Sequence, residues 1–235
     1  MLSLYLREND LATAKLSFQS RRVAKISHIS PKTIDITGNL DPNRAKVERF
    51  IKGVFHEAYH ADISIHYPYL ISVSNEVGEI LAAAGFRYAH KEALFLEQYT
   101  TTPIEQELSV LYGKSVTRRD IVEIGSLASM GSGASVFLYA ALASYLAFKQ
   151  IQYTVVTGTQ DLYRHLKMLG LQPQTVCDAK QTQLQSDNDD WGSYYATCPC
   201  VLTGSVARGV ESLHRTLGSV YENQMPLRYH TGMLS

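Results

Sequence analysis

The segment from Ile121 to Gly158 constrains the fold more than any other part of this chain. It reads as a strand (IVEIGSL, 121–127), a loop of glycine and serine, an apolar helix (135–150) and a second strand (YTVVTG, 153–158). Two apolar strands joined through a helix form a crossover unit, in which the strands run parallel. The sequence therefore predicts an α/β protein with a parallel pair of strands in the middle of its sheet.

The segments before that unit predict antiparallel strands. Tyr69–Ser74 and Glu79–Tyr88 are strand-like runs on either side of a turn, which indicates a hairpin with Gly85 as a bulge. We therefore expect an α+β arrangement in which a mixed, mostly antiparallel central sheet is flanked by helices. No stretch has the composition of a linker, so we expect residues 1–235 to form one domain.

Composition argues against several classes of function. Lys plus Arg and Asp plus Glu are both 22, so the formal net charge is zero. A nucleic-acid binder or a polybasic membrane anchor needs an excess of cations, and we expect neither. The most apolar stretch, residues 134–148, is shorter than the roughly 18 residues of a membrane span. The start of the chain turns charged after six residues, and the three cysteines form no disulfide framework, so we expect a reduced, cytoplasmic protein.

The loop between the strand and the apolar helix suggests an anion site. Gly131, Ser132 and Gly133 precede the helix, and backbone N–H groups at such a helix start can hold a phosphate. Ser129 and Ser135 could add hydroxyl donors. The loop has neither the P-loop pattern nor GxGxxG. The alternative interpretation is a flexible connection with a serine cap.

Four stretches together resemble the thermostable hemolysin family, and the likeness runs from about residue 41 to about residue 213. The stretches are LFLEQYTTTPIEQELS (94–109), VEIGSLAS (122–129), VVTGTQDLYRHLKMLGLQP (155–173) and WGSYY (191–195). This family is placed within the GNAT acetyltransferase superfamily and is similar to N-acyl amino acid and acyl-homoserine lactone synthases. The resemblance implies a GNAT-like fold with a splayed parallel pair. It also implies an N-acyltransferase that moves an acyl group from a CoA or acyl-carrier-protein thioester to the amine of a small-molecule acceptor. The acyl-CoA or acyl-phosphopantetheine would be a co-substrate, with no tightly bound cofactor, and a homodimer is an open alternative.

The same resemblance implies a donor site. In GNAT folds the backbone of a bulged strand pairs with the pantetheine arm, and a loop of the form [QR]xxGx[GA] holds the pyrophosphate. This chain reads ASMGSG there, so the glycines match while Ala128 replaces Gln or Arg, and an acyl carrier protein could be the donor instead of CoA. The expected donor-binding residues are Leu127, Ala128, Ser129, Gly131, Ser132, Gly133 and Ala134.

Two glutamates are candidates for proton transfer. Glu123 lies on the strand beside the expected thioester and Glu97 lies in the LEQY segment, and both interrupt apolar runs. A buried carboxylate needs a partner or a raised pKa. We therefore expect Glu123 to be the base, directly or through water, and Glu97 to orient the acceptor amine. The structural alternative is that each forms an ion pair with an arginine such as Arg118 or Arg119.

The sequence gives weaker signals for two other parts of the site: the acid that protonates the leaving thiolate, and the pocket that binds the acceptor. Many GNAT enzymes have a tyrosine acid where this chain has Leu166, and Tyr163, one turn earlier, is a candidate substitute. Aromatic residues with polar atoms suit an acceptor pocket, although packing in the core is their more frequent role. The expected acceptor-binding residues are Tyr99, Thr157, Trp191, Tyr194 and Tyr195.

Two other classes of function stay open as alternatives. His56, Glu57 and His60 fit HExxH, and His66 has the spacing of a third ligand in a zinc metalloprotease. However, Ile63 occupies the position of the glycine at which such a chain turns, and helical geometry directs the histidines away from the apolar face. We therefore assign no metal ligands. The second alternative is a membrane-active hemolysin-type or non-catalytic ligand-binding protein.

Overall fold

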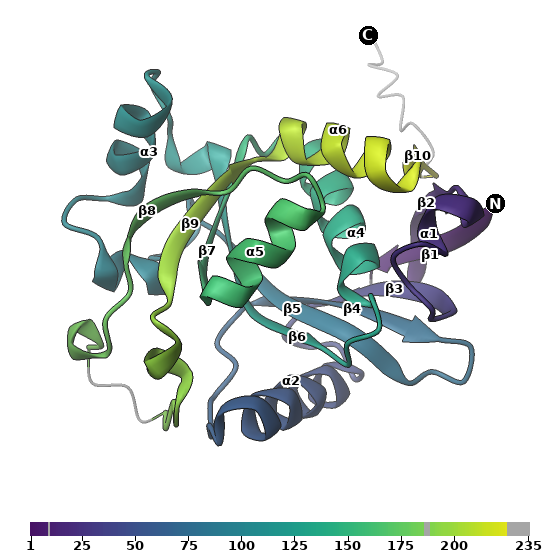
Figure 1. Cartoon of the computed structure of the whole chain (residues 1–235), viewed down its shortest axis with the longest axis horizontal. Helices are drawn as coiled ribbons and strands as arrows, with labels where there is room; N and C mark the ends of the chain where they lie inside the picture. Colours follow the sequence, from purple (N-terminus) through teal and green to yellow (C-terminus); the bar gives the residue numbers. More distant parts are fainter. Residues whose placement is uncertain (9, 186–188, 225–235) are drawn as a thin grey trace, which may run out of the picture.

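The computed structural model describes residues 1–8, 10–185 and 189–224, and in this part of the chain a ten-stranded sheet forms the core (Figure 1). The strand order is β10-β2-β1-β3-β4-β5-β6-β7-β9-β8. The strands are β1 Leu2–Glu8, β2 Leu11–Phe18, β3 Pro31–Thr37, β4 Tyr69–Asn75, β5 Ile80–Tyr88, β6 Ile121–Ser129, β7 Tyr153–Gly158, β8 Gln174–Asp178, β9 Cys200–Ser205 and β10 Val220–Asn223. β6 pairs with β7 and β1 with β3 in parallel, and the other neighbours are antiparallel. The predicted mixed, mostly antiparallel sheet is confirmed, with one more parallel pair than expected.

Helices cover both faces of this sheet (Figure 1). They are α1 Ser20–Val23, α2 Arg44–Tyr59, α3 Ile104–Tyr112, α4 Ser135–Phe148, α5 Gln160–Met168 and α6 Val206–Leu217. α2 packs on β5 and β6 from one side, whereas α4 packs on β3 to β5 from the other side and is itself covered by α6. Because α4 lies between the sheet and α6, it is buried on nearly all sides, which explains its continuous apolar sequence.

The parallel pair separates halfway along its length. β6 and β7 are paired only from Ile121–Ile124 and Tyr153–Val156, although β6 continues along β5, and β7 along β9, to their ends. A bulge bends β6 at this point, because Gly125 pairs with Gly85 while Ala128 pairs with Ala83, so that β6 holds one extra residue. The bulge predicted in the hairpin at Gly85 is wrong in its position, since Gly85 pairs in register with Leu70 of β4 and the extra residue of the hairpin is Leu81.

The loop that leads into α4 is held in place by the segment after α1. Gly131, Ser132 and Gly133 all have positive φ angles, of 82°, 52° and 80°. The Ser132 carbonyl accepts hydrogen bonds from the His28 N–H (3.3 Å) and the Ser27 hydroxyl (3.2 Å). A Cβ on Gly133 would lie 2.5 Å from the Ile26 carbonyl oxygen. The loop is therefore packed against the segment 26–28 and does not stand free of the fold.

The two glycines of this loop provide a matched test of that packing. Gly131 has the same positive φ as Gly133, but a Cβ on Gly131 would meet no atom within 4 Å. We expect Gly131→Ala to lower the free energy of unfolding by about 1–2 kcal/mol through backbone strain. Gly133→Ala should lose about 1–3 kcal/mol more, because the methyl group collides with the backbone at Ile26. Urea denaturation followed by circular dichroism measures both, and equal losses would contradict the close packing of Gly133.

Candidate active site

A cleft of about 380 Å³ opens where β6 and β7 separate. Its walls include residues 125–129 of β6 and residues 157–159 at the end of β7, together with α2, the start of α4, α5 and the segment around Trp191. α2 and α4 lie on opposite faces of the sheet, so the cleft passes through the sheet from one face to the other. Beyond Ile124, no residue of β6 pairs with a residue of β7, so the backbone N–H and C=O groups of β6 on this side lack a partner strand.

The predicted donor residues divide into two groups. Leu127, Ala128, Ser129 and Gly131 line the cleft. The other three, Ser132, Gly133 and Ala134, do not line it: the first two contact the segment 26–28, and the third is buried at the start of α4.

The predicted acceptor residues lie together, with one exception. Thr157, Trp191, Tyr194 and Tyr195 line the cleft, whereas Tyr99 lies behind it and its hydroxyl is 2.5 Å from that of Tyr195. In the described part of the chain, the Thr157 hydroxyl and the Trp191 indole N–H are buried without a hydrogen-bond partner. A polar ligand in the cleft would supply partners for both.

Glu123 lies behind the cleft wall and is only 1% exposed. Its Oε1 accepts a hydrogen bond from the Leu96 N–H (2.9 Å), and its Oε2 accepts one from the Phe95 N–H (3.0 Å). The Arg87 Nε lies 3.3 Å from the same Oε2, so the ion-pair partner of Glu123 is neither Arg118 nor Arg119. Burial raises the pKa of Glu123 to about 7, although Arg87 and the two amides act in the opposite direction. A carboxylate with this pKa can accept a proton at neutral pH.

Glu97 is engaged on all sides by protein groups and does not line the cleft. Its carboxylate forms two contacts with Arg118, at 2.6 and 3.1 Å, and accepts hydrogen bonds from the N–H groups of Leu94 (2.9 Å) and Ile104 (3.3 Å). Burial alone would raise the pKa of Glu97, but Arg118 and the two amides outweigh it and lower the pKa. These contacts fix the 3₁₀ helix Phe95–Tyr99, which presents two amides to Glu123.

A histidine on α5 takes the position at the cleft that was expected for Tyr163. Tyr163 packs against the cluster of Val156 and Leu202 and does not line the cleft. His165 does line it, and its Nε2 is 3.1 Å from the Ser135 hydroxyl at the start of α4. Burial lowers the pKa of His165, which favours the neutral ring. No sequence pattern marks this histidine, since the contact with Ser135 depends on how two helices pack.

Tyr67 and Arg87 also line the cleft, and neither was expected there. The Arg87 guanidinium carbon lies 4.5 Å from the centre of the Tyr67 ring. Tyr67 precedes β4 and Arg87 lies on β5, so the sequence gives no local signal that the two meet at Glu123.

The HExxH residues are arranged differently from a zinc site. His56 and Glu57 are exposed on α2, the helix ends at Tyr59, and His60 follows in a left-handed conformation (φ 55°). The rings of the two histidines are 6.4 Å apart. Across the described ranges, no group of three or more His, Cys, Asp or Glu side chains could hold a metal ion.

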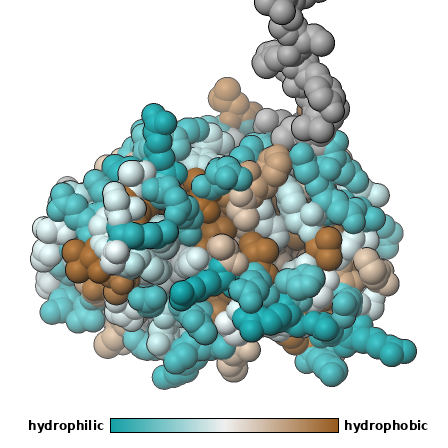
Figure 2. Space-filling view, turned by 90° about the horizontal axis from the view of Figure 1, so that it is seen from above, coloured by the Kyte–Doolittle hydropathy of each residue, from teal (hydrophilic) through white to brown (hydrophobic). Residues whose placement is uncertain are grey.

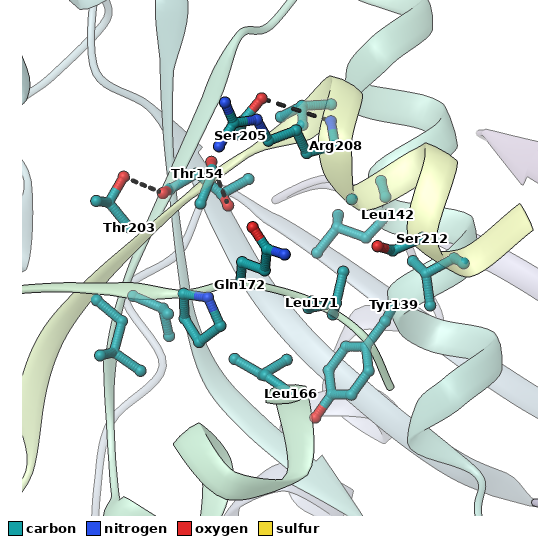
Figure 3. Close-up of a pocket in the computed structure, with 18 of the residues that line it drawn as sticks. Tyr139, Leu142, Thr154, Leu166, Leu171, Gln172, Thr203, Ser205, Arg208 and Ser212 are labelled. Carbon is teal, nitrogen blue, oxygen red and sulfur yellow. Dashed lines mark hydrogen bonds between the residues drawn. The ribbon is translucent and has the colours of Figure 1, made fainter. Parts of the chain in front are cut away.

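A second cavity of about 320 Å³, the apolar cavity, adjoins the cleft (Figure 3). Leu127 and Tyr139 line both spaces. The cavity lies among α4, α5, α6, β7 and β9, and Leu142, Leu166 and Leu171 contribute to its walls. Figure 2 views the molecule of Figure 1 from above and shows apolar side chains in the middle of a largely hydrophilic face. Thr154, Thr203, Ser205 and Arg208 lie at one end of the apolar cavity, Gln172 lies nearer its middle, and Ser212 and the Tyr139 hydroxyl lie on other sides.

The sequence model of the thermostable hemolysin family matches residues 37–210. The chain belongs to this family. None of the curated proteins matches the chain.

Solved structures with a similar fold are enzymes that make acylated small molecules. The acyl-homoserine lactone synthase LasI is 14% identical, with a TM-score of 0.54, and the match covers 80% of this chain and 96% of LasI. FeeM, an N-acyl amino acid synthase from uncultured soil microbes, is 12% identical with a TM-score of 0.52 over 76% of this chain and 93% of FeeM. The CoA-dependent acyl-homoserine lactone synthase BjaI, with SAM and isopentyl-CoA, is 10% identical with a TM-score of 0.52 over 79% of this chain and 89% of BjaI. At these identities the comparison concerns the fold alone, and it confirms the GNAT-like fold expected from the sequence.

Within the described residues, no helix combines the length and the apolar character that crossing a bilayer requires.

The contacts of Glu97 predict how its removal changes stability. We expect Glu97→Gln to lower the free energy of unfolding at pH 7 by about 2–4 kcal/mol, because Arg118 and two amides lose a charged partner. Since the pKa of Glu97 is lowered in the folded protein, its contribution is present above its unfolded pKa and disappears as the pH falls. The stability of the wild type should therefore fall more steeply below about pH 5 than that of the variant. Thermal unfolding between pH 3 and 7 tests this, with the exposed Glu57→Gln as the control, and parallel curves would contradict it.

Proposed function

We propose that this protein is an N-acyltransferase that moves an acyl group from a phosphopantetheine thioester, carried by CoA or an acyl carrier protein, to the amine of a small molecule. The observation that carries the proposal is the cleft between β6 and β7, which exposes the bulged backbone of β6 in front of a buried carboxylate. A thioester arm is extended and rich in amide groups, so it can pair with a strand edge that lacks a neighbour.

In this proposal the two faces of the sheet serve different substrates. The acyl chain enters the apolar cavity on the side of α4 and α6, and the wall residues Leu127 and Tyr139 connect it to the cleft. The amine approaches from the side of α2, where Trp191, Tyr194 and Tyr195 form the wall. Transfer of apolar surface from water into such a cavity contributes about 0.8 kcal/mol for each methylene group. The cavity therefore favours acyl groups longer than acetyl.

The side chains at the cleft supply the proton transfers that this reaction needs. The amine nitrogen attacks the thioester carbonyl carbon, so a C–N bond forms and the C–S bond breaks. The proton lost by the amine passes to Glu123, whose pKa of about 7 suits it to this role. Backbone N–H groups of the β6 bulge stabilise the oxyanion. The Ser135–His165 pair lies at the place expected of Tyr163 and can donate a hydrogen bond to the leaving thiolate. The thiolate takes its proton from water, which balances the proton that Glu123 returns to water.

The direct experiment is an acyl-transfer screen. Purified protein is incubated with C2 to C12 acyl-CoAs and acyl carrier protein thioesters, and with the twenty amino acids and S-adenosylmethionine as amines. We expect release of free thiol that depends on an amine, together with an acylated product in the mass spectrum. Thermal shift with the same donors adds a binding readout, because a ligand of the native state raises the unfolding midpoint. Absence of thiol release and of any thermal shift across the whole screen would overturn the proposal.

Gly209 on α6 allows the apolar cavity to be filled without damage to the fold. A Cβ at this position would meet only the Leu171 side chain, at 3.7 Å. We expect Gly209→Leu to lower kcat/KM for a decanoyl donor at least tenfold relative to a butanoyl donor, because the leucine occupies space that the longer chain needs. Stability should stay the same or rise, since leucine favours a helix over glycine by about 1 kcal/mol.

The matched control is Gly53→Leu on α2, where a Cβ would meet no atom within 4 Å. This variant should leave the ratio of decanoyl to butanoyl activity unchanged. An unchanged ratio in Gly209→Leu as well would show that the acyl chain does not enter the apolar cavity.

A further inference from the structure

The proposed base cannot reach the acceptor by itself. Glu123 is 1% exposed and is separated from the cleft by side chains that line it, among them Tyr67, Arg87 and Phe95. Both of its carboxylate oxygens also accept hydrogen bonds from backbone amides. A proton that leaves an amine in the cleft therefore needs a group that lies between the amine and this carboxylate.

Tyr67 occupies that place, and two glycines make room for it. Gly85 on β5 and Gly125 on β6 are cross-strand partners. A Cβ on Gly85 would lie 2.5 Å from the Tyr67 Cγ, and a Cβ on Gly125 would lie 1.9 Å from the Tyr67 hydroxyl oxygen. The phenol thus lies flat across both strands, and its hydroxyl is at the β6 bulge, where the sheet opens. Any side chain at either glycine would displace it.

The other contacts of Tyr67 fix the ring and direct its hydroxyl. The Arg87 guanidinium stacks on the ring at 4.5 Å and also lies 3.3 Å from Glu123. Glu123 is the carboxylate that acts on the Tyr67 phenol: burial first, and then the charge of Glu123, raises the pKa of the phenol well above its usual value. The hydroxyl therefore stays protonated and can transfer a proton without becoming an anion. The phenol of Tyr194 and the carboxylate of Glu97 are the other titratable groups that act on this pair, and Glu92 faces the far side of Arg87.

We propose that Tyr67 is a catalytic residue that relays the proton of the acceptor amine to Glu123. This rests on the proposed function. As the amine nitrogen forms its bond to the acyl carbon, its proton moves to the Tyr67 oxygen while the Tyr67 hydroxyl proton moves to a Glu123 oxygen. Tyr67 is unchanged at the end of the step, Glu123 is neutral, and the proton returns to water after the amide and the thiol have formed.

The variant Tyr67→Phe tests the relay, because it removes the hydroxyl and keeps the ring between the two glycines. Rates are measured with octanoyl-CoA or octanoyl carrier protein, whichever the wild type uses, and with the best amine of the screen and hydroxylamine as acceptors. We expect kcat to fall about 100-fold while the KM for the donor changes less than threefold. In the wild type, kcat/KM should fall below about pH 7, where Glu123 becomes protonated. In the variant this acid limb should be absent with hydroxylamine, which is unprotonated at neutral pH.

A double-mutant cycle separates a relay from two independent contributions. If two groups act in the same proton path, removing either one interrupts the path, and removing the second costs no further rate. The double variant Tyr67→Phe/Glu123→Gln should therefore be no slower than the slower of the two single variants. Losses that multiply would overturn the relay, as would a Tyr67→Phe enzyme with the rate and pH profile of the wild type. If Glu123→Gln does not fold, as judged by circular dichroism, the pH profile of Tyr67→Phe decides the matter.

The matched control is Tyr69→Phe. Tyr69 lies two residues further along, stacks on Phe86, and its hydroxyl accepts a hydrogen bond from Lys91 away from the cleft. Its rate and pH profile should equal those of the wild type. If the wild type itself transfers no acyl group, the proposed function fails; if the wild type is active and Tyr67→Phe behaves like Tyr69→Phe, the relay alone fails.

Discussion

The desolvated carboxylate of Glu123 is the constraint on which the arrangement of the site depends. A charge taken out of water in the middle of a sheet is costly unless other groups replace its hydration. Here the replacement comes from Arg87 on the neighbouring strand and from the amides of Phe95 and Leu96. These two amides belong to the 3₁₀ helix Phe95–Tyr99, which is stabilised in turn by Glu97. The Glu97 carboxylate accepts a hydrogen bond from the Leu94 N–H at the start of this helix, and it forms an ion pair with Arg118. The polar residues between β5 and β6 thus form one continuous network.

The opening of the sheet places a cleft directly in front of this network. If β6 and β7 stayed paired to their ends in the same register, Gly125 and Thr157 would face each other across a ladder and nothing could pass between them. The bulge turns β6 aside at Ser126, whose φ of 49° is unusual for a residue other than glycine. α2 and α4 cover opposite faces, so the opening joins a wall of aromatic side chains to an apolar cavity. A polar acceptor and an apolar chain can therefore meet without sharing a surface.

Local pattern predicted the centre of the fold well and its edges poorly. β7 was predicted with its observed bounds, and the hairpin of β4 and β5 within one residue at each end, because buried strands have continuous apolar sequences. The edge strands β8 and β10 were not predicted, nor was β2, which lies next to β10. β9 begins only at Cys200, because Cys198 just before it adopts a left-handed conformation that no strand contains. Edge strands have fewer apolar residues, so their place in the sheet follows from long-range pairing that the sequence does not display.

The same distinction between local and long-range signals applies to the site. The family motif located the residues of β6 and the segment near Trp191 that line the cleft. It did not locate Tyr67, Arg87 or His165, because each acquires its role from a neighbour on another element. A pair of glycines on adjacent strands is visible in the sequence, but only the register between β5 and β6 shows that both make room for one phenol.

The glycine loop shows how the structure refines a motif. In the pattern typical of GNAT folds, both glycines leave space for a pyrophosphate at the start of the helix. Here a Cβ on Gly131 would meet open space, whereas the place of a Cβ on Gly133 is closed by the backbone at Ile26. Ala128 also lacks the long polar side chain usual at the first position of the motif. If the proposed function holds, the pantetheine arm and the acyl chain therefore supply most of the contacts with the donor, and the pyrophosphate supplies few. CoA and an acyl carrier protein share the pantetheine arm and differ beyond it. This loop should therefore distinguish between the two donors less strongly than the loop of an enzyme with the full motif.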